Sequence, residues 1–168
     1  MKKTLLGVAM VAVFGLTTTV AMADTLADIK KKGFIQCGVA PSTPGFALPD
    51  ASNNWSGLDV EYCKALAAAV FNDTNAVRYT PLTSTERFAA LANGEVDVLS
   101  RTTTWTMGRD TSLGITFTGV TYYDGQGFMV RKADGITSAS QLSGATICIE
   151  KGTTTELNAA DYFAAHNL

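Results

Sequence analysis

The residues from Ser100 to Asp110 combine the side chains that recognise small anions. They read S-R-T-T-T-W-T-M-G-R-D and supply two guanidinium groups, three consecutive hydroxyls and one large aromatic ring. A guanidinium group can hold a carboxylate through two charge-assisted hydrogen bonds, each worth about 1.5 to 3 kcal/mol. The stretch predicts a carboxylate site in which Arg109 holds the anion, with the surroundings completed by Arg101, Thr102, Thr103, Thr104 and Trp105. A threonine-rich surface loop with two solvated arginines is the alternative on these residues alone.

Two further loops carry residues that suit the same kind of site. The loop from Thr43 to Phe46 holds an aromatic ring that fits no helix face and could form the floor of a pocket. Gly152, Thr153 and Thr154 precede a predicted helix, and free backbone N–H groups at a helix start attract anions. An ordinary helix N-cap is the alternative for this second loop. Together the three loops predict a cleft between two α/β units.

The sequence holds few groups that could perform covalent or acid–base chemistry. It has no G-x-S-x-G, P-loop or G-x-G-x-x-G pattern, and its one histidine, His166, stands two residues before the end. Three well-separated cysteines form no C-x-x-C pair, which argues against a zinc ribbon or a redox motif. We therefore expect no catalytic residue, no metal site and no cofactor.

Alternating strands and helices must position these loops. Hydrophobic periodicity predicts strands over 34–39, 77–80 and 96–100, a helix over 58–71 and a second, short helix between Thr83 and Asn93. Thr83 and Glu86 form a capping box before the second helix, and Asn93 and Gly94 give it a left-handed stop. This order predicts parallel strands with helices packed on the sheet, and ligands bind at the carboxyl ends of such strands.

A second α/β unit is predicted to begin in the last third of the chain. Gly127 to Arg131 indicates an extended segment, Ser138 could cap a one-turn helix, and Ala145 to Ile149 predicts a buried strand. The turn from Gly152 to Thr155 then opens a helix that continues to about Ala165.

The cysteines leave two interpretations open. Cys37 lies in the first predicted strand and Cys63 in the helix after it, and such elements pack together in a β-α unit. In an oxidising compartment these two could form a disulfide and leave Cys148 as a free thiol. They could equally be two small buried apolar residues.

The N-terminus predicts export through a cleavable signal peptide over residues 1–23. Lys2 and Lys3 precede an apolar stretch from Leu5 to about Leu16, and an A-x-A cleavage site follows at 21–23. A membrane anchor is the alternative, but a spanning helix needs about 20 mostly apolar residues, and glycines and threonines interrupt this stretch. With 46% hydrophobic and 17% charged residues the chain suits one ordinary core, and its net charge of −2 gives no indication of nucleic-acid binding.

Several long stretches resemble the periplasmic solute-binding proteins of ABC amino-acid transporters, and within them the general L-amino-acid-binding branch. They are GLDVEYCKALAAAVF at 57–71, NGEVDVLSRTTTWTMGRD at 93–110, GVTYYDGQGFMVRK at 119–132 and GTTTELNAADYF at 152–163. The resemblance implies an α/β, two-lobed, type II periplasmic binding protein fold. A nearly complete first lobe would span 24–125 and a partial second lobe 126–168.

The resemblance also implies roles for individual residues. Arg109 would hold the α-carboxylate of the ligand, Thr102 and Thr104 would supply hydroxyl and backbone contacts, and Thr154 would add a backbone N–H. Arg101 would face the side chain of an acidic or amide ligand. Several relatives carry an aromatic ring over the ligand where this chain has Thr43, so that stacking role would pass to Phe46.

The function implied is periplasmic binding of L-amino acids, of the glutamate, glutamine, aspartate and asparagine kind, by a monomer that delivers them to an ABC permease. The family pairs the ligand ammonium with an aspartate that would lie beyond Leu168, so we expect a truncated chain. Two alternatives use the same fold: a dehydratase-type enzyme, which would need an acid or base in the cleft, and a sensory ligand-binding domain.

Overall fold

A three-stranded parallel sheet forms the centre of the protein. The computed structural model describes residues 25–168, so the predicted signal peptide lies outside the described residues. Strand β1 (Ile35–Val39) is central, between β4 (Val77–Pro81) and β5 (Val98–Leu99). The parallel α/β organisation is the one that the strand and helix alternation predicts.

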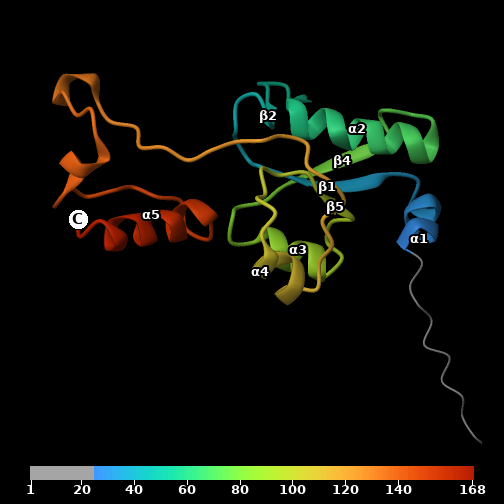
Figure 1. The fold of residues 1–168 in the computed structure, drawn as a ribbon. Helices are drawn as coiled ribbons and strands as arrows, with labels where there is room; N and C mark the ends of the chain where they lie inside the picture. The colour runs from blue at the N-terminus through green and yellow to red at the C-terminus, as the bar shows by residue number, and fades with distance from the viewer. Residues whose placement is uncertain (1–24) are drawn as a thin grey trace, which may run out of the picture.

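Helix α2 (Leu58–Phe71) covers one face of this sheet (Figure 1). Alternate residues of a strand point to opposite faces, and Cys37 and Val39 of β1 point toward α2. They are fully buried there with Val60 and Cys63 of the helix. The buried face of α2 is thus formed by Val60, Cys63 and Ala67, whereas the apolar positions whose spacing predicts the helix are exposed or half-buried: Leu58, Tyr62, Leu66 and Val70.

Helix α3 (Arg87–Ala92) covers the opposite face, with a smaller core of Leu82, Ala90 and Val96. Gly38 of β1 faces this side, where a Cβ atom would stand 2.6 Å from the Leu99 side chain. The small core therefore closes directly on the backbone of the central strand.

The strand order β4-β1-β5 creates a switch point between β1 and β5. The chain leaves β1 toward α2 on one face, whereas the connection from β4 to β5 runs through α3 on the other. The loops that follow β1 and β5 therefore separate at the carboxyl end of the sheet. Open α/β sheets bind their ligands at such a position.

Short elements complete the described chain. A small antiparallel pair lies in the loop after β1, and a helix α4 follows β5. No helix among residues 25–168 has the length and apolar character needed to cross a bilayer. The remaining elements are α1 (Thr25–Lys32), β2 (Leu48–Pro49), β3 (Trp55–Ser56), α4 (Met107–Ser112), α5 (Thr154–Ala165) and two 3-10 helices, η1 (Lys132–Asp134) and η2 (Ala139–Leu142).

Several sequence predictions are confirmed closely. Helix α2 has the predicted limits, α5 lies where the Gly152 turn predicts it, and Ser138 caps η2 in a capping box with Gln141. The box predicted at Thr83 is only half formed. Glu86 accepts from the Thr83 backbone N–H at 3.0 Å, but the Thr83 hydroxyl donates to Glu86 instead of capping the helix. Helix α3 consequently starts at Arg87.

Two predicted extended segments were wrong as strands. Residues 127–131 and 145–149 form no ladder, and most of 145–149 is exposed although the sequence predicts a buried strand. A strand needs a neighbour to satisfy its backbone N–H and C=O groups, and neither segment has one in the described part of the chain. Figure 1 shows the chain in this region running away from the sheet before it turns back into α5. Strand β5 is also shorter than predicted.

Cys37 and Cys63 are joined by a disulfide, which links β1 to α2, and Cys148 is free and exposed. The bond closes a loop with a sequence separation of 26 residues. Of the two interpretations that the sequence left open, the bridged one is confirmed.

Reduction of this disulfide should destabilise the protein by about 3 kcal/mol, because a closed loop of this length restricts the unfolded chain. Urea unfolding with and without dithiothreitol measures the change. A Cys148→Ser variant should show the same loss, since its thiol takes no part in the bond. Equal stability of the oxidised and reduced forms would contradict the expectation.

Candidate functional site

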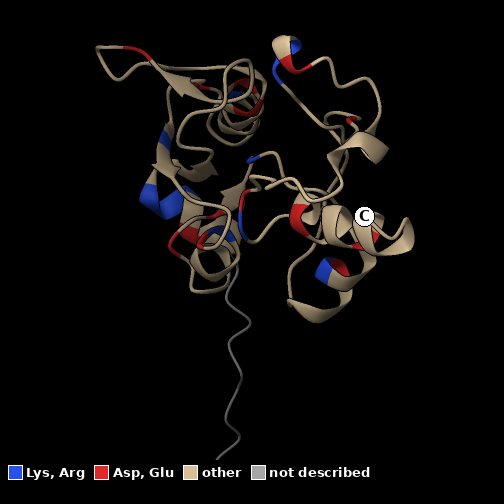
Figure 2. Cartoon of the chain, turned by 90° about the vertical axis from the view of Figure 1, so that its left-hand side faces the viewer, with Lys and Arg blue, Asp and Glu red and all other residues tan. Residues whose placement is uncertain are grey.

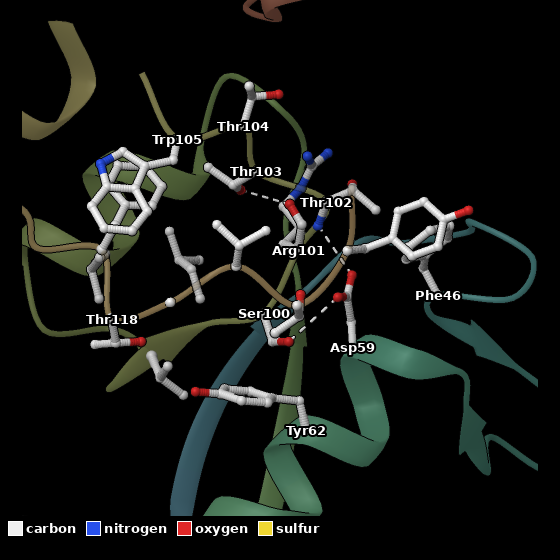
Figure 3. Close-up of a pocket in the computed structure, with 18 of the residues that line it drawn as sticks. Phe46, Asp59, Tyr62, Ser100, Arg101, Thr102, Thr103, Thr104, Trp105 and Thr118 are labelled. Atoms are coloured by element: carbon white, nitrogen blue, oxygen red, sulfur yellow. Dashed lines mark hydrogen bonds between the residues drawn. The ribbon is translucent and has the colours of Figure 1, made fainter. Parts of the chain in front are cut away.

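A cavity of about 570 Å³ opens at the switch point (Figure 3). Its walls come from the loop after β1, the first turns of α2, the loop after β5 and the crossing segment 115–124. Polar and aromatic side chains make up much of the lining, among them Thr43, Phe46, Asp59, Tyr62, Ser100, Arg101, Thr102, Thr103, Thr104, Trp105 and Glu150. The cavity therefore lies where the sheet topology places a ligand.

Asp59 links α2 to the loop after β5. Its carboxylate accepts the Thr102 backbone N–H at 3.0 Å and the Ser100 hydroxyl at 3.5 Å, as Figure 3 shows. The residue is only 4% exposed. Burial raises the pKa of this carboxyl, against the lowering effects of the two hydrogen bonds and of Arg101. The start of α2 thus holds residues 102–104, which we call the threonine loop, through a buried carboxylate.

The Thr102 backbone has a positive φ of 32°, an unusual conformation for a β-branched residue. Such conformations persist only where surrounding contacts enforce them, and they concentrate at ligand sites. The bond to Asp59 is such a contact. It turns the chain sharply between Arg101 and Thr103, so that successive residues of the loop point in different directions around the cavity.

Three arginines gather beside this loop. Lys and Arg are spread along the chain in short separate segments (Figure 2), so it is the fold that brings Arg87, Arg101 and Arg109 together. Burial, together with repulsion from the other two arginines, lowers the pKa of Arg87 to about 10, while Glu150 acts in the opposite direction. All three guanidinium groups remain cationic at neutral pH.

Arg101 is buried in the cavity wall, and its Nε and Nη2 donate to groups of the protein. Its Nε donates to the Leu82 carbonyl at 2.8 Å, and its Nη2 donates to the Ser84 hydroxyl at 3.0 Å. The same nitrogen lies 3.5 Å from a carboxylate oxygen of Glu150. Burial lowers the pKa of Arg101, and Glu150 opposes that shift. The arginine predicted to meet a ligand side chain therefore already contacts a carboxylate.

Arg109 lies beside the cavity, outside its lining. Its guanidinium donates to the Thr104 carbonyl at 2.8 Å and lies 5.1 Å from the centre of the Phe88 ring. Burial lowers its pKa. The side chain is held next to the threonine loop by one hydrogen bond and one cation–π contact.

The turn before α5 meets the threonine loop. The Thr104 and Thr154 hydroxyl oxygens lie 3.2 Å apart and share a hydrogen bond, and Arg87 donates to the Gly152 carbonyl at 3.2 Å. Thr153 is the N-cap of α5, since its hydroxyl accepts from the Glu156 backbone N–H at 3.1 Å. The N-cap alternative thus describes Thr153, and Thr154 is the residue that reaches the loop.

Aromatic rings border the cavity on two sides. Trp105 stacks on Phe117 with ring centres 5.3 Å apart, and it is 46% exposed. Phe46 meets Tyr122 edge to face at 5.2 Å. Phe46 therefore lies in the cavity wall, where the sequence predicts a pocket floor, and its ring has a protein partner.

Most of the residues predicted to form the site line the cavity: Thr43, Phe46, Arg101, Thr102, Thr103, Thr104 and Trp105. Arg109, Thr153 and Thr154 lie next to it. Sequence reasoning missed Asp59, Ser84, Arg87 and Glu150. Only Arg87 could have been suspected from the sequence. It is the first residue of a short helix whose following residues are apolar, and such a helix packs against the core and can bury its first side chain.

This donor set suits a carboxylate. It consists of guanidinium groups, hydroxyls and backbone N–H groups. All of these donate hydrogen bonds to carboxylate oxygens, and a guanidinium group can donate two to the same carboxylate. Within residues 25–168 no three His, Cys, Asp or Glu side chains gather as metal ligands. The predicted absence of a cofactor stays a prediction.

The chain belongs to the bacterial extracellular solute-binding proteins, family 3, whose family model matches residues 35–166. It is 59% identical over 169 residues to the general L-amino acid-binding periplasmic protein AapJ of Rhizobium johnstonii, covering 100% of this chain and 50% of that protein. It is 54% identical over 158 residues to the glutamate/glutamine/aspartate/asparagine-binding protein BztA of Rhodobacter capsulatus, covering 94% of this chain and 47% of that protein.

A solved structure agrees with both relatives. An ABC transporter periplasmic binding protein from Brucella ovis with glutathione bound superposes with a TM-score of 0.84 at 59% identity, covering 87% of this chain and 46% of that chain. The resemblance to the general L-amino-acid-binding branch and the α/β periplasmic binding protein fold class are thereby confirmed. The chain spans about half the length of these relatives.

Asp59→Asn should change how stability depends on pH. Because the folded state raises the pKa of Asp59, the folded protein binds a proton more tightly than the unfolded chain does. The contribution of this group is therefore most favourable below its unfolded pKa, and it is lost as pH rises through the folded pKa. Unfolding free energies of both proteins, measured upward from about pH 4, should show a smaller decline in the variant. Parallel curves would contradict this.

Proposed function

We propose that this chain binds L-amino acids and belongs to the uptake machinery of an ABC transporter. The observation that carries the proposal is the cavity at the switch point, where a loop of hydroxyls and arginines meets the turn before α5. The names of AapJ and BztA support an amino acid as the ligand. The glutathione in the Brucella ovis relative supports a site that also accepts an amino-acid group with a larger substituent.

The ligand's α-carboxylate is assigned to Arg109 and the threonine loop. Thr102 and Thr104 supply hydroxyl and backbone contacts, and Thr154 supplies a backbone N–H from the α5 start. The hydroxyl contact between Thr104 and Thr154 supports this assignment, because it puts both loops within reach of one small molecule. To reach a carboxylate in the cavity, Arg109 would exchange its hydrogen bond with the Thr104 carbonyl and its contact with the Phe88 ring for the ligand.

Residues 24–125 act as the first lobe of a hinged clamp and residues 126–168 as the beginning of the second. The compact sheet with α2 and α3 supports the first assignment, and the contacts of Glu150, Gly152 and Thr154 with the arginine and threonine loop support a cleft between the two. Closure of such lobes around a ligand is a common hinge motion. In this proposal the closed form presents the ligand to an inner-membrane permease.

The protein works in the periplasm as a monomer and performs no catalysis. The relatives AapJ, a periplasmic binding protein, and BztA, an amino-acid-binding protein, support the location and the carrier role. The dehydratase alternative needs an acid or base in the cleft. The residues that line the cavity include no histidine, and the Asp59 and Glu150 carboxylates both accept hydrogen bonds from the protein. A carrier also has to release its ligand unchanged, which suits a site built from hydrogen-bond donors.

This chain should bind glutamate and glutamine more weakly than full-length AapJ. Micromolar affinity requires a binding free energy of about −8 kcal/mol, and a ligand of nine or ten heavy atoms reaches that value only with contacts on most of its surface. This chain spans 50% of AapJ and offers correspondingly fewer contacts. Isothermal titration of both proteins under the same conditions measures the difference, which we expect to exceed tenfold. Equal affinities would contradict the expectation.

Arg109→Ala should abolish detectable amino-acid binding, because it removes the proposed partner of the α-carboxylate. Arg131→Ala is the matched control, since it removes the same charge from an exposed side chain away from the cavity. Titration with glutamine separates this effect from any preference for acidic side chains. Unchanged binding in the Arg109 variant would remove the central residue of the proposal.

A further inference from the structure

The protein places the carboxylate of Glu150 beside the cluster of Arg87, Arg101 and Arg109. The Ser84 hydroxyl donates to Glu150, and Nη2 of Arg101 lies 3.5 Å from the same carboxylate oxygen. Arg101 also donates to the Ser84 hydroxyl at 3.0 Å, so the two donors are fixed relative to each other. We call Ser84 and Arg101 the carboxylate seat. Glu150 occupies it here, and Glu150 also lines the cavity.

The seat and its occupant differ strongly in burial. The Arg101 side chain is 5% exposed, whereas the Glu150 side chain is 65% exposed. Arg101 is further anchored to the Leu82 carbonyl. An exposed carboxylate regains its hydration easily when it leaves, but a buried guanidinium left without an anion is strongly destabilised. The seat is therefore built to stay in place while its anion exchanges.

The charge around the seat favours an additional anion. Arg87 is 2% exposed, and in the described chain it makes no ion pair with a carboxylate. Its Nη1 donates to the Thr103 hydroxyl at 3.2 Å, but its buried Nε has no hydrogen-bond partner. Buried charges usually require a partner of opposite sign. With Arg109 the cluster holds three guanidinium groups, whereas only two carboxylates act on it, those of Glu150 and Asp59, so positive charge is in excess.

We propose that Glu150 is an internal counter-ion that an acidic ligand replaces on Ser84 and Arg101, so that Glu150 sets the discrimination between acidic and uncharged ligands. The inference rests on the proposed function and adds the seat for the ligand's second carboxylate. An acidic ligand brings its own anion and displaces Glu150 toward solvent. An amide ligand leaves Glu150 in place and hydrogen-bonds beside it. One site thereby accepts both classes.

The seat itself is tested without any amino acid. Glu150→Ala should lower the melting temperature in chloride buffer, and acetate at constant ionic strength should restore it in a saturable manner, because acetate can enter the vacated seat. Glu95→Ala is the matched control, since Glu95 is exposed and lies away from the cavity. Acetate should leave the control and the unmodified protein unchanged. An equal acetate effect on all three proteins would overturn the proposal.

The discrimination is tested with Glu150→Gln, which keeps the size of the side chain and removes its charge. Isothermal titration should show the affinity ratio of glutamate to glutamine rising about tenfold, which corresponds to about 1.4 kcal/mol. Glu95→Gln should leave the ratio unchanged. A ratio that stays constant or falls in the Glu150 variant would overturn the proposal.

The two experiments separate this inference from the proposed function. If the unmodified protein binds neither amino acid, the proposed function fails, and the acetate result still decides whether the seat exists. If it binds both and Glu150→Gln leaves their ratio unchanged, the function stands and the role of Glu150 fails.

Discussion

The buried carboxylate of Asp59 is the contact on which the site depends. It joins the first turn of α2 to the Thr102 backbone, and in doing so it maintains a conformation that a threonine rarely adopts. The residues on either side of Thr102 serve different partners as a result. Arg101 points into the buried cluster with Ser84, whereas Thr104 faces the turn before α5. The hydrogen bond between Asp59 and Thr102 thus keeps Arg101 and Thr104 on two different sets of partners.

Local patterns predicted the elements well. The apolar spacing of Leu58, Tyr62, Leu66 and Val70 gave the limits of α2, although the helix buries other positions, Val60 and Cys63, against β1. The order of strands and helices predicted the parallel sheet and therefore the edge at which the cavity lies. The threonine and arginine stretch was located correctly for the same reason, since it follows a strand of that sheet.

Contacts between distant parts of the chain could not be predicted in this way. Nothing in the sequence distinguishes the polar residues Ser84 and Glu150. Only the folded chain brings Glu150 to Arg101 and Ser84, which lie 49 and 66 positions earlier. At residues 145–149 the sequence instead predicts a strand that the structure does not form. Their composition is that of a buried strand, but a strand also needs neighbours, and composition does not report whether they are present.

The disulfide gives α2 a further property. Asp59 and Cys63 are four residues apart and so lie on the same side of the helix. The covalent bond to β1 therefore restrains the turn that carries the carboxylate as well as the core beneath it. Restraint of this kind lowers the entropy lost when a ligand is bound, because the loop is ordered in advance. Oxidation of the two thiols during maturation would accordingly preorganise the recognition loop before any solute arrives.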